Sequence, residues 1–176
     1  MPAQLQHQDH TPASPKLSIY LICDRISSPA NLGSLFRSAD AFGVDRIFLY
    51  QMQDLLHSKR LRRTSRSTED RIPSIHLSSL PELHSLFDKE KFILVAIELT
   101  SGSKSLATFE PIPNKTVVLI VGNENFGISE ELLALADLHL HIDMYGHNSS
   151  MNVAVATGIA LYEIRKQQLT HTNNEY

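Results

Sequence analysis

Three short segments of the chain combine polar side chains with backbone features that favour ligand binding. Residues 31–37 open a predicted helix, residues 121–129 form a loop with two glycines, and residues 142–153 lead into a predicted helix N-terminus. Glycines let a ligand approach the backbone closely, and a helix N-terminus offers free N–H groups to anions and carboxylates. The polar side chains in these segments include those of Asn31, Arg37, Glu124, Ser150 and Asn152.

Each segment also has an ordinary structural explanation. A helix arginine is usually solvated, a strand-to-helix turn can leave Glu124 exposed without any ligand, and Ser150 and Asn152 can act as simple helix caps. The glycine loop has the spacing of a P-loop, but Ile128 stands where the P-loop lysine belongs, which argues against a triphosphate site. The chain has no GxSxG elbow, so a hydrolase triad lacks support.

The histidines and the cysteine offer weaker signals. His139 and His141 share one strand face and His147 follows, yet strand histidines at this spacing are more often surface residues, so we predict no metal site. Cys23 ends an apolar strand, which favours a buried, inert thiol. A lone cysteine cannot form a disulfide within the chain, which favours a reduced, cytoplasmic protein.

The basic residues are unevenly distributed. Residues 59–71 hold six basic and two acidic side chains, a net charge of +4, whereas the other ten basic and seventeen acidic residues leave the rest at −7. A local basic patch on an acidic protein favours a phosphate-bearing partner such as nucleic acid, although a solvated loop is the alternative. The cluster consists of Lys59, Arg60, Arg62, Arg63, Arg66 and Arg71.

Strands and helices alternate along the chain and must position these segments. The predicted strands are residues 17–23, 44–50, 92–98, 117–121 and 138–142. The predicted helices are residues 28–42, 79–87, 129–136 and 150–168. Residues 51–74 and 102–115 show no clear period and are predicted as loops. The alternation predicts an α/β fold with a mostly parallel sheet of five or six strands and helices on both faces.

Length and composition fit one globular domain. The chain has 176 residues and a mass of 19.8 kDa, with 42% hydrophobic and 20% charged residues. Its apolar runs are too short for a membrane helix, and no secretory signal is visible. We expect a disordered leader at residues 1–16, a folded domain at residues 17–168 and a frayed tail at residues 169–176.

Taken in order, the three segments resemble the three motifs of the SpoU (TrmH) family of RNA ribose 2′-O-methyltransferases, which belongs to the SPOUT class. The resemblance covers about residues 17–167, and the order and spacing of three motifs make it specific. Asp143 replaces the usual proline, Met151 the usual leucine and Ala154 a common serine. The matching residues are Asn31, Arg37, Gly43, Val44, Asp45, Gly122, Glu124, Gly127, Ile128, Ile142, Met144, Gly146, Ser150, Asn152 and Val153.

The resemblance implies a C-terminal trefoil knot whose loops hold S-adenosylmethionine (SAM), and a homodimer with the site at the subunit interface. Fitting the family's cofactor site, we expect Ile97, Gly122, Ile142 and Met151 to line the cofactor pocket. No metal or membrane is implied.

The resemblance also implies methyl transfer to a ribose 2′-OH of structured RNA. Arg37 would clamp the target phosphate and stabilise the developing oxyanion, with proton acceptance as a secondary role, because a free guanidinium is a poor base. Asn31 and Asn152 would orient Arg37 and the ribose. Glu124 would accept hydrogen bonds and hold either the arginine or the motif loops, and Ser150 would cap the last helix and fix the cofactor loop.

Lys59, Arg60, Arg62, Arg63 and Arg66 would contact the RNA backbone at the mouth of the site. We expect tRNA rather than rRNA as the substrate, because the leader of about 16 residues is too short for an additional RNA-binding domain. The alternative is a catalytically weak RNA-binding module on the same scaffold.

Overall fold

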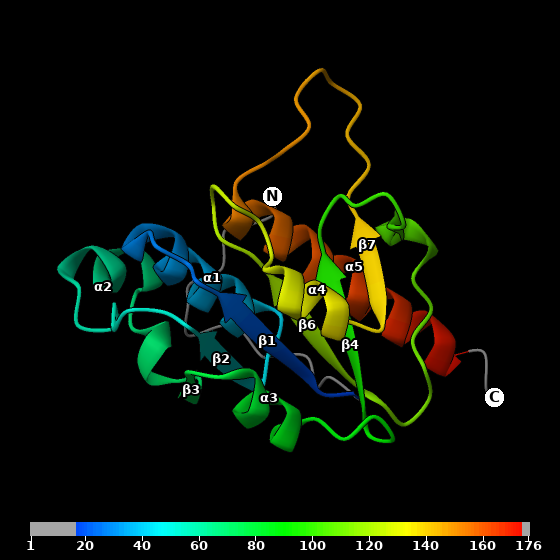
Figure 1. Ribbon diagram of the computed structural model, residues 1–176, viewed down its shortest axis with the longest axis horizontal. Coiled ribbons are helices and arrows are strands. Elements are labelled where there is room, and N and C mark those ends of the chain that lie inside the picture. The colour runs from blue at the N-terminus through cyan, green and yellow to red at the C-terminus, as the bar shows by residue number, and fades with distance from the viewer. Residues whose placement is uncertain (1–16, 174–176) are drawn as a thin grey trace, which may run out of the picture.

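The computed structural model describes residues 17–173, which form a single sheet covered by helices (Figure 1). Within these residues the sheet has seven strands in the order β3-β2-β1-β6-β4-β7-β5, and every strand pair is parallel. The strands are β1 (Ile19–Asp24), β2 (Arg46–Tyr50), β3 (Ser74–Leu77), β4 (Phe92–Ile97), β5 (Lys104–Ser105), β6 (Thr116–Val121) and β7 (Leu138–His141).

Helices cover both faces of the sheet, as predicted. One face packs against α1, α2 and α5, and the other packs against α3 and α4. The helices are α1 (Pro29–Ala41), α2 (Lys59–Ser65), α3 (Leu80–Leu86), α4 (Glu130–Leu135) and α5 (Val153–Asn173), with short 3₁₀ turns at Thr68–Asp70 and Leu106–Thr108.

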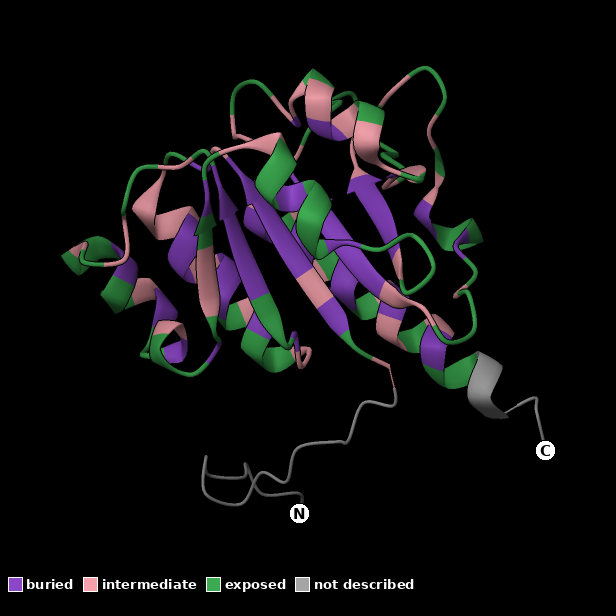
Figure 2. Cartoon of the chain, turned by 60° about the horizontal axis from the view of Figure 1, so that its bottom comes forward, coloured by how far each residue is buried: buried purple, intermediate pink, exposed green. Residues whose placement is uncertain are grey.

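The strands are buried between these two helical layers (Figure 2). In β1, Leu21 and Cys23 belong to the core under α1 and α5, whereas Ile22 belongs to the core under α3 and α4. This division follows from the alternation of side chains along a strand. Because both faces are covered, the central strands are apolar almost throughout, as in other parallel sheets.

Local capping signals place α1 where the sequence predicts it. The Ser28 side chain accepts a hydrogen bond from the Asn31 backbone N–H (3.4 Å), and Pro29 occupies the first turn. The helix ends at Phe42, and Gly43 then adopts φ 63°, a conformation that glycine tolerates without strain.

The predicted loop at residues 51–74 contains regular structure. The Ser58 side chain accepts a hydrogen bond from the Arg60 backbone N–H (3.3 Å) and begins α2, which buries Leu61 against α1. The two helices meet closely at Gly33, where a Cβ would lie 2.1 Å from Oγ1 of Thr64. The segment then ends in strand β3, so the prediction of a loop there was wrong.

Three further boundaries differ from the predictions. The predicted loop at residues 102–115 holds β5 and a 3₁₀ turn, which brings the sheet to seven strands. Helix α3 spans residues 80–86 rather than 79–87, and Glu82 accepts hydrogen bonds from the N–H and hydroxyl of Ser78 just before it. Helix α5 continues through Asn173, beyond the predicted helix end at residue 168. The predicted leader at residues 1–16 and the last three residues lie outside the described part of the chain.

The strands of the C-terminal half of the chain do not lie in the sheet in their sequence order. After β4 it forms β5 at the far edge and returns to place β6 between β1 and β4. The trefoil knot that the family resemblance implies is not visible in Figures 1 and 2 and stays a prediction. Between residues 17 and 173, no helix has both the length and the apolar character needed to cross a membrane.

Candidate functional site

A cavity of about 1160 Å³ lies where strands β4, β6 and β7 end. This is the edge at which open α/β sheets bind their ligands. The four residues predicted to hold a cofactor, Ile97, Gly122, Ile142 and Met151, all line it. Of the five polar residues predicted to do chemistry, the four that also line it are Asn31, Glu124, Ser150 and Asn152.

Glu124 connects the glycine loop to the start of α1. One carboxylate oxygen accepts hydrogen bonds from the N–H (3.1 Å) and hydroxyl (3.0 Å) of Ser27. The other accepts from the N–H of Ser28 (3.0 Å) and from Nδ2 of Asn31 (2.9 Å). Burial alone would raise the pKa of Glu124, but these donors favour the ionised form and lower the pKa to about 2. Glu124 is therefore a fixed carboxylate at neutral pH.

Asn31 passes this link on to the start of α5. Its Oδ1 accepts a hydrogen bond from Nδ2 of Asn152 (3.0 Å). Oδ1 of Asn152 in turn accepts from the backbone N–H groups of Ala154 (2.9 Å) and Val155 (3.3 Å), which is N-cap geometry. A chain of hydrogen bonds thus joins three segments that are distant in the sequence.

Ser150 does not cap the last helix. Helix α5 begins at Val153 and is capped by Asn152, so the predicted cap lies two residues too early. Ser150 is exposed, and its backbone N–H donates to Oδ1 of Asn148 (3.4 Å). It lies in the segment between β7 and α5, which projects away from the body of the molecule (Figure 1).

Arg37 lies apart from this network. It is exposed, it does not line the cavity, and it makes none of the hydrogen bonds or ion pairs found among the described residues. Arg37 lies six positions after Asn31 in α1, and this spacing places the two side chains about 120° apart around the helix axis. We expected Asn31 and Asn152 to orient Arg37. Within this chain they form a hydrogen bond with each other instead.

The glycine loop is a tight turn in which positions 122 and 127 favour glycine over any larger residue. Asn123 and Gly127 exchange backbone hydrogen bonds of 3.0 and 2.9 Å. A Cβ on Gly122 would lie 2.2 Å from the carbonyl carbon of Gly127, and Gly127 itself has φ 69°. The Glu98 carboxylate accepts a hydrogen bond from the Ile128 N–H (3.1 Å), which links the end of the turn to the residue that follows β4.

Comparisons with known proteins agree with this geometry. The model of the SpoU rRNA Methylase family matches residues 18–162. The chain belongs to the SpoU family.

Three relatives illustrate the range of the SpoU family. The chain is 34% identical over 147 residues to a Bacillus subtilis 23S rRNA (guanosine(2553)-2′-O)-methyltransferase, covering 82% of this chain and 57% of that protein. An AdoMet-bound rRNA methyltransferase from Sinorhizobium meliloti superposes with a TM-score of 0.78 at 31% identity, covering 90% of this chain and 59% of that one.

A structure from work on 2′-OH methylation of C/U34 on tRNA superposes with a TM-score of 0.75 at 27% identity, covering 88% of this chain and 98% of that one. The chain spans about three fifths of the length of the curated relatives it matches.

The cavity suits the cofactor bound to the Sinorhizobium relative. It combines apolar side chains, including Ile97, Ile142 and Met151, with backbone groups of glycine-containing loops. Oγ1 of Thr100, a residue of the cavity wall, is buried without a hydrogen-bond partner. A ligand with polar groups can satisfy such an atom, since buried polar groups are rarely left unpaired.

Asp143, which replaces the usual SpoU proline, is held on the wall of the cavity. Its carboxylate accepts a hydrogen bond from the Ser105 hydroxyl (2.5 Å) and lies 3.5 Å from Nε2 of His141. The Ser103 hydroxyl lies 3.0 Å from Nδ1 of the same histidine. Across residues 17–173, no group of three or more histidine, cysteine or acidic side chains is arranged to hold a metal ion.

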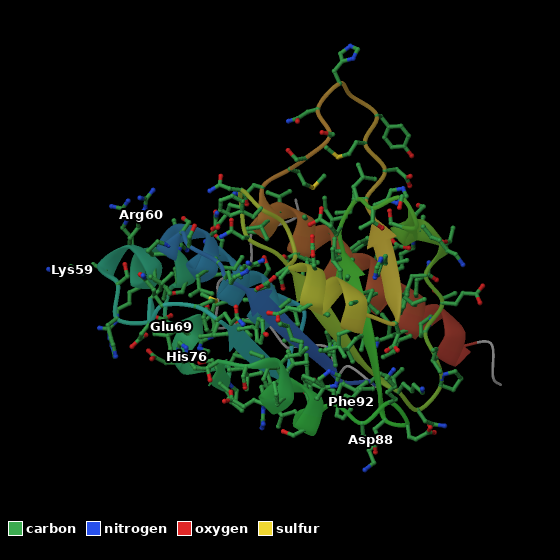
Figure 3. All side chains as sticks on the ribbon, viewed as in Figure 1. Lys59, Arg60, Glu69, His76, Asp88 and Phe92 are labelled. Atoms are coloured by element: carbon green, nitrogen blue, oxygen red, sulfur yellow. The ribbon has the colours of Figure 1, made fainter. Side chains whose placement is uncertain are left out.

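The predicted RNA-contacting residues lie on and beside α2. Lys59 and Arg60 extend away from the body of the protein, far from the end of the sheet marked by Asp88 and Phe92 (Figure 3). Arg71 pairs loosely with Asp40 (3.8 Å). The other basic residues of the segment are exposed and have no acidic partner within the described residues: Lys59, Arg60, Arg62, Arg63 and Arg66.

Sequence reasoning missed several residues that build the site. Ser27 and Ser28 hold the Glu124 carboxylate, and Asn123 fixes the glycine loop by donating to the Arg25 carbonyl (2.6 Å). The one available signal was the two serines between β1 and α1, since a serine there can bind a carboxylate through its N–H and its hydroxyl.

Proposed function

We propose that the protein transfers a methyl group from SAM to a ribose 2′-OH of structured RNA. The observation that carries this proposal is the cavity at the carboxyl ends of β4, β6 and β7, whose wall includes Glu124, Asn31 and Asn152 in one hydrogen-bonded chain. Support comes from the similarity to the Bacillus subtilis 2′-O-methyltransferase and to the AdoMet-bound rRNA methyltransferase of Sinorhizobium meliloti. The single buried cysteine favours the reducing cytoplasm as its location.

SAM, when bound in the cavity, supplies an electrophilic methyl group on a sulfonium centre. Ile97, Gly122, Ile142 and Met151 hold it by apolar contact and backbone groups. The chain's own contribution is to position the ribose, since a correctly placed nucleophile gains much of its rate from proximity. The hydrogen bonds of Glu124 keep Asn31 in place, and Asn31 keeps the N-terminus of α5 against the cavity.

We propose that Arg37 acts in the cavity of a partner subunit. Within its own chain it lies outside the network, so a second copy has to bring it to the reacting ribose. There its guanidinium binds the phosphate of the target nucleotide and stabilises the ribose 2′ oxygen while the proton of the 2′-OH passes to water. An exposed apolar stripe on α5 favours such a homodimer, because Val155, Ile159, Tyr162 and Leu169 share one helix face.

For the substrate we propose tRNA. Support comes from the structure from the tRNA methylation work, which superposes over 88% of this chain with a TM-score of 0.75. The exposed basic residues of α2 would bind the RNA backbone, which predicts that affinity falls steeply with salt concentration.

The test is calorimetric titration with SAM and S-adenosylhomocysteine, with ATP as the control, followed by methyl transfer to bulk tRNA and to 23S rRNA. We expect saturable binding near one per chain for both SAM compounds, no ATP binding, and transfer to tRNA that disappears in Arg37→Ala. Transfer to 23S rRNA alone would overturn the tRNA assignment. RNA binding without cofactor binding, with or without RNA present, would favour a non-catalytic RNA-binding module.

A further inference from the structure

Phe126 stands on the rim of the cavity and is almost fully exposed. Its relative exposure is 82%, although it belongs to the residues that line the cavity. It therefore contributes little to the hydrophobic core. Single exposed apolar residues are common on protein surfaces, so its position and its rigidity have to carry the argument.

The backbone beneath Phe126 is locked in place. Oδ1 of Asn123 accepts hydrogen bonds from the N–H groups of Asn125 (2.9 Å) and Phe126 (3.2 Å). The bridge between Asn123 and Gly127 closes the turn on both sides, and Gly127 has a φ of 69°, which side chains rarely adopt. The ring is thus presented outward by a preorganised turn, which lowers the entropy cost of binding a partner.

Glu124, two residues before Phe126 in the same turn, forms hydrogen bonds with the start of α1. The turn therefore holds one of these side chains in the network and presents the other to solvent. The segment between β7 and α5 lines another side of the cavity and carries an exposed aromatic residue, Tyr145, which is not itself part of the cavity lining. An exposed ring on the cavity rim, in a chain whose α2 carries unpaired basic residues, matches the composition of sites that stack nucleobases and bind phosphates.

We propose that Phe126 stacks on a nucleobase of the RNA, at or next to the nucleotide whose ribose enters the cavity. This inference rests on the proposed function, because a ribose can meet a cofactor in the cavity only if its nucleotide crosses the rim. The contact uses the face of the base and not its hydrogen-bonding edge, so it fixes the position of the nucleotide without selecting a base.

The experiment measures the binding of fluorescently labelled bulk bacterial tRNA, in the presence of S-adenosylhomocysteine, by wild type, Phe126→Ala, Phe126→Leu and Phe126→Tyr. Loss of one stacked base predicts affinity about 5- to 150-fold weaker for Phe126→Ala. Phe126→Leu keeps an apolar side chain without a ring and stays weak, whereas Phe126→Tyr restores binding. The slope of log affinity against log salt stays unchanged, because no phosphate contact is lost.

The matched control is Leu86→Ala, which shortens an exposed apolar side chain on α3 that does not line the cavity, and it leaves tRNA affinity unchanged. Equal tRNA affinity of wild type and Phe126→Ala would overturn the inference. Weaker S-adenosylhomocysteine binding, or a smaller mass in sedimentation of Phe126→Ala, would also overturn it by assigning the ring to the cofactor or to a subunit interface.

Methyl transfer by the wild type separates the two proposals. If the wild type methylates tRNA and Phe126→Ala binds it normally, the stacking inference alone is wrong. If the wild type binds tRNA through Phe126 without methylating RNA, the proposed function fails and the contact stands. If the wild type binds no tRNA, stacking on tRNA is refuted as well.

Discussion

Replacing Glu124 with glutamine tests the hydrogen-bonded network directly. The carboxylate accepts four hydrogen bonds, two on each oxygen, from Ser27, Ser28 and Asn31. A carboxamide retains one acceptor oxygen, and its NH₂ group must face donors on the other side. The lowest-energy orientation turns the NH₂ toward Ser27, whose hydroxyl can rotate to accept, and keeps the bond from Asn31.

The pKa of Glu124 sets the magnitude. A shift from 4.5 to about 2 corresponds to about 3 kcal/mol if the whole effect is counted at 1.36 kcal/mol per unit. Because the side chain is only partly buried, solvent screening reduces this to about 1–2 kcal/mol. We therefore expect Glu124→Gln to lower the free energy of unfolding by about 1–2 kcal/mol at pH 7.

The sign of the pH dependence follows from the lowered pKa. The stabilisation by ionised Glu124 is complete above the unfolded value of 4.5 and is lost as the pH falls towards 2. Urea unfolding of wild type and Glu124→Gln, at one protein concentration, should give a difference at pH 3 less than half of that at pH 7. A difference that is equal at the two pH values would refute the idea that these donors hold Glu124 ionised.

Three further predictions concern neighbouring parts of the site. Gly122→Ala forces a Cβ to within 2.2 Å of the Gly127 backbone, so urea unfolding should show a loss of about 3 kcal/mol; wild-type stability would contradict the close approach. Arg37→Ala removes an exposed side chain, so the free energy of unfolding should change by less than about 0.5 kcal/mol and SAM affinity measured by calorimetry should stay constant, while methyl transfer is lost; persisting transfer would refute its assigned role. Burial raises the pKa of the Cys23 thiol, so Ellman's reagent should react with the native protein only as fast as it unfolds, and rapid labelling of folded protein would count against this.

The parts of the fold that could be predicted are those with local signals. Helix α1 has a serine cap, a proline in its first turn and a glycine after its end, and each acts within a few residues. Helix α2 has seven residues and one deeply buried apolar side chain, Leu61, so no periodicity marks it. Strands β3 and β5 are too short to show alternation.

The motifs identified residues that line the cavity but not the hydrogen bonds between them. Glu124 and Asn31 were both predicted as site residues, yet their bond spans 93 residues and depends on β1 and β6 being neighbours in the sheet. The same limit explains Ser150 and Asn152, because either residue type can cap a helix and only the packing of α5 selects the second. The motifs also did not show that the Arg37 side chain lies outside the cavity of its own chain.

The close contact between Gly33 and Thr64 has a mechanical consequence. Because no side chain larger than that of glycine fits at residue 33, α1 and α2 are in direct contact there, with Asn31 near the start of α1 and the basic side chains on α2. An RNA backbone gripped by α2 is then held at a constant spacing from Asn31. The pair of helices would then select the nucleotide that reaches the cavity by its distance along the RNA backbone.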